Sequence, residues 1–210
     1  MILLTALKDK LDAVKAAVNT ENAAEAIEAN DLNARNAAYE GIAKLATKIK
    51  LAVEVNVNDE AFLADMQTLN RRMNGSRAAA KTADNPATLD IDESANANST
   101  SQQSFDDLLA TFTEIIARLE SRPDYKPNET DVQLATLQTR HAAMTAANNK
   151  AKASTAAART ARQTRDDLLY DETDGVLKLV KLIKAYVKQK FSKGDPTYDA
   201  IIGMDFSKPR

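Results

Sequence analysis

The chain contains a single histidine, and its surroundings decide whether metal or acid–base chemistry is available. His141 is preceded by Gln138 at the position where di-iron helical bundles carry the glutamate of a Glu-x-x-His motif, and such bundles need two of these motifs. Because the chain has one histidine, zinc sites built from several histidines are also excluded. Because no acid or nucleophile is predicted beside it, we interpret His141 as a packing or surface residue.

A second group of candidate ligands is the acidic cluster Asp90, Asp92 and Glu93. Carboxylates bind hard cations such as Ca²⁺, but this cluster lacks the glycine and the distal glutamate of an EF-hand loop. We therefore interpret the cluster as solvated acids in a polar segment. The sequence predicts no metal site and no cofactor.

Catalytic motifs that depend on cysteine or glycine are also missing. The chain has no cysteine, which excludes disulfides and thiolate metal sites. Phosphate-binding loops, nucleotide fingerprints and nucleophile elbows need glycines at defined spacing. The glycines here stand singly at predicted turns: Gly41, Gly75, Gly175, Gly194 and Gly203. We expect a protein that is not an enzyme and that has no small-molecule substrate.

Four lysines recur every three or four residues near the end of the chain, as residues on one helix face do. They are Lys178, Lys181, Lys184 and Lys188. With Tyr186, this stripe fits binding to nucleic-acid phosphates or to an anionic membrane. The alternative is the solvated face of a soluble bundle, where lysines commonly point outward. Lys44 and Lys48 partly repeat the stripe, so both interpretations stay open.

Two bands of opposite charge lie far apart in the sequence. The acidic band is Glu21, Glu25 and Glu28, and the basic band is Arg159, Arg162 and Arg165. If the two segments lie side by side, the bands pair and set the register of the helices. The alternative is separate exposure to solvent, where ion pairs contribute little to stability. Both alternatives stay open at this point.

The elements that position these residues are helices. Glycine and proline number five each, whereas alanine, the best helix former, is abundant. Apolar residues at three- and four-residue spacing predict an all-α fold. The predicted helices span about 2–40, 42–55, 59–73, 104–121, 129–170 and 176–191, with a short turn of helix at 196–203.

Capping residues and apolar seams refine these helices. Asn58 or Asp59, Ser104, and Asp195 are predicted N-caps, as is either Asn128 or Thr130 for the helix that starts at 129. The buried seam of the first helix is expected to be Leu4, Leu7, Leu11, Val14 and Val18.

Composition divides the chain into three parts. Residues 1–74 form an N-terminal helical unit, residues 75–103 a polar linker or long loop, and residues 104–210 a C-terminal helical unit. We expect the two helical units to pack together as one elongated bundle of long antiparallel helices.

The two helical units share an internal repeat. Thirteen residues from Gly41 align with thirteen from Gly175, with matching lysines and apolar residues. Upstream, an arginine and a tyrosine recur, and downstream an aspartate followed by an aromatic residue. We interpret the units as two related helical hairpins that cover one another's apolar faces.

The C-terminal half resembles a known family. The segments 123–129, 135–138, 165–170, 175–191 and 192–201 are similar to a family of bacterial all-helical proteins of unknown function. The resemblance extends more faintly to residues 30–65. It implies an all-helical fold and implies no activity, cofactor or partner.

Charge and hydropathy limit the classes of function. A net charge of −2 gives no global steering toward nucleic acid or anionic membrane. No stretch approaches the ~20 apolar residues of a membrane span, and the start does not resemble a secretory signal. We expect a cytoplasmic scaffolding or protein-interaction protein that works through helix–helix contacts, including self-association. The rival is a module whose lysine-bearing helices bind an anionic membrane or nucleic acid.

Overall fold

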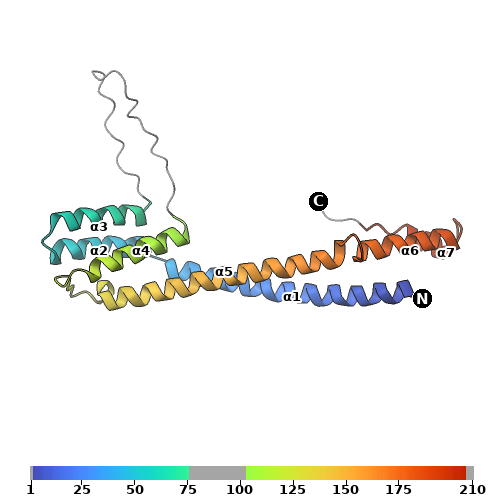
Figure 1. Ribbon diagram of the computed structural model, residues 1–210, viewed down its shortest axis with the longest axis horizontal. Helices are drawn as coiled ribbons and strands as arrows, with labels where there is room; N and C mark the ends of the chain where they lie inside the picture. Colours follow the sequence, from blue (N-terminus) through green and yellow to red (C-terminus); the bar gives the residue numbers. More distant parts are fainter. Residues whose placement is uncertain (1, 76–102, 207–210) are drawn as a thin grey trace, which may run out of the picture. The chain divides into compact units, whose positions relative to one another are not determined.

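The computed structural model describes residues 2–75 and 103–206, and the regular elements within these ranges are all helices (Figure 1). The acidic cluster at 90–93 and nearly all of the expected linker lie outside these ranges. The elements are α1 (Ile2–Tyr39), α2 (Ile42–Asn56), α3 (Glu60–Met73), α4 (Phe105–Glu120), the 3₁₀ helix η1 (Thr130–Val132), α5 (Leu134–Tyr170), α6 (Val176–Lys190) and α7 (Pro196–Ile202).

Three of the predicted N-caps are confirmed. The Asp59 carboxylate accepts a hydrogen bond from the Phe62 amide at 3.0 Å, and the Ser104 hydroxyl accepts one from the Asp107 amide at 3.1 Å. Asp195 accepts from the Thr197 amide at 2.7 Å and precedes Pro196. Each cap satisfies an amide that has no partner in the first turn of its helix.

The predicted start of the long helix at residue 129 is wrong. The helix α5 begins at Leu134, and the preceding residues form η1 instead. The buried Tyr125 hydroxyl donates to the Val132 carbonyl at 2.8 Å, and burial raises the pKa of Tyr125 to about 12. This bond takes a carbonyl that a helix starting at 129 would use itself. Neither Asn128 nor Thr130 therefore caps α5.

The helix α1 is continuous over its whole length, as expected. The Thr20 hydroxyl donates to the Ala16 carbonyl at 3.0 Å, a bond to the preceding turn of the same helix.

Contacts group the chain into two units whose bounds differ from the expected 1–74 and 104–210. Residues 1–32 and 151–210 form the terminal unit, and residues 33–150 form the central unit. The expected division at 75–103 falls inside the central unit. The difference arises because α1 and α5 each contribute one stretch to each unit.

The central unit holds a core of large apolar side chains. The helices α2, α3 and α4 lie together with the end of α1 and the start of α5 (Figure 1). Ile49, Phe112 and Leu137 are fully buried in this core. At its edge the rings of Tyr39 and Phe105 meet edge to face at a centroid distance of 4.9 Å.

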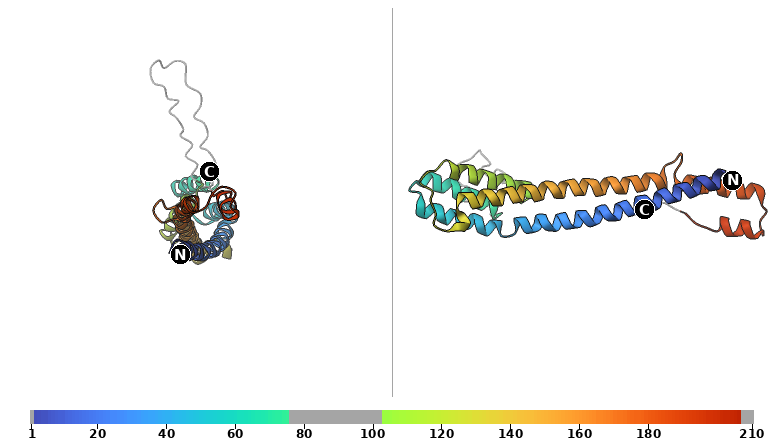
Figure 2. Two further views of the ribbon diagram at one scale, coloured as in Figure 1. Left: turned by 90° about the vertical axis from the view of Figure 1, so that its right-hand side faces the viewer. Right: turned by 90° about the horizontal axis from the view of Figure 1, so that it is seen from below.

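The terminal unit has an interior of small side chains. In this unit α1 and α5 run antiparallel, because Arg162 pairs with Glu25 whereas Arg165 pairs with the earlier Glu21, and the right-hand view of Figure 2 shows the two helices side by side. The buried alanines are Ala17, Ala151, Ala158 and Ala161. These small side chains remove little apolar surface from water compared with leucine. The leucine, isoleucine and aromatic side chains whose burial is described in this unit are half-buried or exposed.

The expected apolar seam of α1 is only partly buried. Leu7 and Val14 are half-buried, but Leu4 is 70% exposed and Leu11 is 39% exposed. The helix is turned so that Ala17 and Glu21 also face inward. This orientation brings Glu21 against α5 and leaves one side of the predicted seam uncovered. The inward residues of α5 recur every seven positions: Leu137, Met144, Ala151, Ala158 and Arg165.

Candidate interaction surface

The helix α6 concentrates positive charge on its exposed side. Its fifteen residues include five lysines and no acid. Lys178, Lys181 and Lys188 are exposed, as the sequence predicts, and none of the three forms an ion pair or hydrogen bond with a residue in the described ranges. These lysines are therefore available to a partner.

Lys184 departs from the expected stripe. Its ammonium group donates to the Ile202 carbonyl at 3.4 Å and to the Met204 carbonyl, and it lies 5.8 Å from the centre of the Phe206 ring. Carbonyls at the end of a helix have no partner within it, so a lysine is a favourable donor there. Lys184 thus attaches α6 to the end of α7 and is not part of the exposed face.

Two apolar side chains share the exposed side of α6 with the lysines. Leu182 is 42% exposed and Tyr186 is 53% exposed, whereas Val176 and Val187 are buried on the opposite side. Because residues three and four apart share a helix face, Lys178, Lys181, Leu182 and Tyr186 form one continuous surface. We call Lys178, Lys181, Leu182, Tyr186 and Lys188 the outer face of α6.

The turn before α6 is held by Asp171. One oxygen of its carboxylate accepts from the Thr173 amide at 2.7 Å, the Asp174 amide at 3.1 Å and the Thr173 hydroxyl. The Thr173 hydroxyl and these two amides lower the pKa of Asp171 to about 2. A Cβ on Gly175 would lie 2.6 Å from the Asp171 backbone, so this position excludes any side chain. The direction of α6 is therefore fixed at its start.

The two charged bands pair in the terminal unit. Arg162 donates to Glu25 at 2.8 Å and to Glu28 at 3.1 Å, and Arg165 donates to Glu21 at 2.6 Å. These hydrogen bonds raise the pKa of Arg162, and the bond to Asp166 is the main cause of the raised pKa of Arg165. Of the two alternatives left open by the sequence, pairing is confirmed for these residues.

Arg159 does not join the pairing. It is exposed and forms no ion pair with a residue that the structure describes. Asp174 stands in the turn after α5, and its carboxylate accepts a hydrogen bond from Lys10 of α1 at 2.7 Å. This ion pair is a further contact of α1 within the terminal unit.

His141 lies in the central unit and has a packing environment. Its Nε2 atom lies 2.8 Å from the Thr113 hydroxyl, and its ring is tilted against Phe112 at 6.2 Å. Within the described ranges no group of three or more histidine, aspartate or glutamate side chains is arranged to hold a metal ion.

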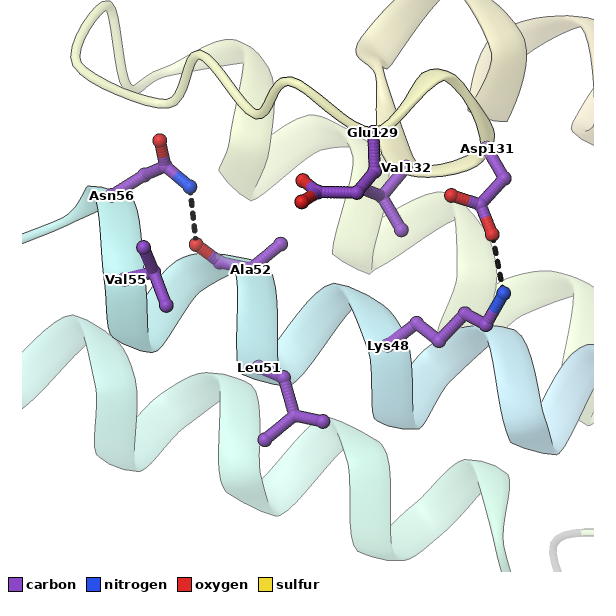
Figure 3. A pocket seen from close by; sticks show the side chains of 8 residues that line it. All are labelled: Lys48, Leu51, Ala52, Val55, Asn56, Glu129, Asp131 and Val132. Atoms are coloured by element: carbon purple, nitrogen blue, oxygen red, sulfur yellow. Dashed lines mark hydrogen bonds and ion pairs between the residues drawn. The ribbon is translucent and has the colours of Figure 1, made fainter.

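A small pocket of about 290 Å³ opens beside α2 in the central unit (Figure 3). Leu51 and Val55 form its apolar side, and Glu129 lies across from them. Lys48 donates to Asp131 at 2.6 Å, which lowers the pKa of that carboxyl. This ion pair is exposed to solvent, and the other polar side chains that line the pocket are Asn56 and Glu129.

Sequence reasoning did not single out this pocket. The available signal was the pair Leu51 and Val55, two apolar residues four positions apart on the helix predicted at 42–55.

No helix in the described part of the chain combines the length and apolarity that crossing a membrane requires. The chain matches no protein-family model, no curated protein and no solved structure. The resemblance to a bacterial all-helical family therefore stays a prediction.

Proposed function

We propose that this chain is a non-enzymatic scaffolding protein that associates with a second copy of itself through α1. The proposal is carried by one observation, the uncovered side of the α1 seam. Leu4 and Leu11 are 70% and 39% exposed, and Val18 is half-buried. These residues are seven positions apart, so they follow one line along the helix. We call Leu4, Leu11 and Val18 the outer stripe of α1.

The width of the apolar surface on α1 supports association. A helix that pairs with a single neighbour needs a narrow seam, whereas a helix in a larger bundle carries a wider apolar face. In α1 the seam formed by Leu7 and Val14 faces inward, and the outer stripe widens it on one side. A further helix packed on this stripe would complete the burial.

The interior of the terminal unit adds a second argument. Among its described residues, the buried apolar side chains are four alanines and two valines, which remove little apolar surface from water compared with leucine. Covering Leu4 and Leu11 would supply apolar burial that the unit otherwise lacks. A second copy is the occupant that we propose, because most soluble oligomers are symmetric dimers in which one patch meets itself.

The internal repeat of helical units is a second part of this proposal. We infer that α1–α2–α3 and α5–α6–α7 are related units. In support, α2 and α6 each have fifteen residues, and an aspartate caps the helix that follows each of them. The turns before them differ, since Gly41 has a φ of 74° and Gly175 a φ of −62°. A scaffold built from repeated helical units is consistent with this arrangement.

Light scattering during size-exclusion chromatography tests the proposed association. The wild-type chain is expected to elute with twice its mass of 22.8 kDa over a range of concentrations. The double substitution Leu4→Gln with Leu11→Gln should give a mass of one chain, because it places polar groups on the stripe.

Ile27→Gln is the matched control, since Ile27 is an exposed apolar residue of α1 outside the outer stripe. This variant should stay dimeric. A wild-type chain that is monomeric at every concentration, or a loss of the dimer in the control alone, would contradict the proposal.

A further inference from the structure

We propose that the outer face of α6 binds an anionic lipid surface. This inference stands on α6 alone and does not depend on the association of α1. It begins from a contrast of charge, since the whole chain carries −2 whereas α6 carries five lysines and no acid. The attraction is therefore local to one helix.

The lysines of the outer face are available for such binding. Lys178, Lys181 and Lys188 are exposed and make no ion pair within the described ranges. A cationic side chain next to anionic headgroups is attracted within about 10 Å, the distance over which salt screens the interaction. The acids nearest in sequence stand in the turn at 171–174, before the helix, and Asp174 is already paired with Lys10. The outer face itself contains no opposing charge.

The apolar residues of the outer face favour an anionic membrane over nucleic acid as the ligand. Leu182 and Tyr186 are 42% and 53% exposed beside the lysines. Tyrosine is favoured at the boundary between headgroups and acyl chains, and leucine is favoured just below it. A nucleic acid would engage the lysines through its phosphates but would offer Leu182 no apolar surroundings. The combination of lysines with exposed leucine and tyrosine is typical of a helix that lies on a membrane surface.

The rest of the terminal unit holds this face in place before binding. Val176 and Val187 are buried on the opposite side of α6, and Lys184 attaches the helix to the end of α7. The turn at Asp171 fixes the start of the helix. Binding therefore requires no folding of α6, and the exposed groups are arranged before contact.

Sedimentation with vesicles tests the proposal on the full-length chain. We expect the wild type to sediment with phosphatidylcholine–phosphatidylserine vesicles at low salt, and not with vesicles of phosphatidylcholine alone. Changing Lys178, Lys181 and Lys188 to glutamate should weaken binding by more than about a hundredfold, since each lysine near an anionic surface contributes a factor of about five and each glutamate adds repulsion. Added salt should weaken wild-type binding in the same direction.

A matched control separates the face from the net charge. Changing Lys8, Lys44 and Lys126 to glutamate alters the net charge by the same amount at exposed positions outside α6, and should leave binding unchanged. Equal loss in both triple variants, or no binding of the wild type to anionic vesicles, would overturn the proposal. Circular dichroism of each variant confirms that the helices are retained.

The apolar contribution has its own variant. Leu182→Ser with Tyr186→Ser keeps every charge and should reduce vesicle binding while leaving any binding to a DNA duplex unaffected. A chain that binds the duplex as tightly as the vesicles, with no effect of these two substitutions on the vesicles, would overturn the lipid assignment in favour of a general phosphate-binding face.

Discussion

At the scale of single residues, Glu21 and Arg165 carry the most specific information in the terminal unit. Glu21 is only 5% exposed, which is unusual for an acid. A buried charge is tolerated only when a counter-ion and hydrogen bonds accompany it, and Arg165 supplies both at 2.6 Å. Sliding α1 along α5 would separate the pair. The pair therefore favours one register of the two helices over its neighbours.

Removing Arg165 should destabilise the chain. We expect Arg165→Ala to lower the free energy of unfolding by about 1–3 kcal/mol, because the buried Glu21 carboxylate would lose its partner. Urea denaturation followed by circular dichroism measures this change. Arg159→Ala is the control and should have almost no effect, since Arg159 is exposed and forms no ion pair within the described ranges. Similar losses in the two variants would show that Glu21 does not depend on its ion pair.

At the scale of elements, the buried alanines of α5 form a seam of small side chains in the terminal unit. Ala151 and Ala158 are completely buried and lie seven residues apart on the inward side of α5. Larger side chains at these positions would push the helices apart and lengthen the ion pairs beside them. We therefore expect added bulk in this seam to disturb the charge pairing as well.

The substitution Ala158→Leu tests the seam. It should lower the free energy of unfolding by about 1–3 kcal/mol, the usual cost of inserting bulk into a closely packed interior. Ala156→Leu is the matched control, because Ala156 is exposed on the same helix and leucine is also a good helix former. Thermal unfolding of both variants measures the difference. A stabilised Ala158→Leu chain would mean that the seam contains a void.

Much of the helical layout could be predicted from the sequence because it is encoded locally. Ser104 and Asp195 are capping residues predicted where their helices begin, and Asp59 is one of the two candidates predicted for α3. The start of α5 could not be predicted, because it depends on the Tyr125 hydroxyl and its contact with Val132. Local patterns do not report such a contact.

Tertiary contacts also explain what sequence reasoning missed at the candidate surface. Lys184 repeats the spacing of its neighbours, yet the carbonyls that end α7 and follow it hold its ammonium group. The pairing of the charged bands was one of two open alternatives, since only the fold determines whether two distant segments meet. Helical spacing groups all four lysines of the stripe, but only the fold distinguishes the exposed Lys178, Lys181 and Lys188 from Lys184.

At the scale of the whole molecule, apolar burial is unevenly distributed between the two units. The contiguous core of large side chains, which includes Ile49, Phe112 and Leu137, belongs to the central unit. The helices α6 and α7 of the terminal unit bury only Val176 and Val187 in full, and α7 has no buried residue. Local opening costs least where few apolar contacts are lost.

Hydrogen exchange should reveal this difference between the units. We expect the amides of α2 and α4 to exchange slowest and those of α6 and α7 to exchange much faster, as measured by mass spectrometry of peptic fragments. Phe112→Ala should lower the free energy of unfolding by about 3–5 kcal/mol and accelerate exchange in the central unit. Equal protection of α4 and α6 in the wild type would contradict the uneven distribution.

The seven-residue recurrence along α5 limits how such a chain can change in length. Deleting one residue rotates everything beyond it by about 100° around the helix axis, which would turn Ala158 and Arg165 away from α1. An insertion of seven residues in α5 alone keeps the phase but shifts the opposing charges out of alignment. Only a matched insertion of whole heptads in both helices preserves phase and pairing together. The helix pair is therefore a module whose span can grow or shrink in fixed steps of about 10 Å, given a rise of about 1.5 Å per residue.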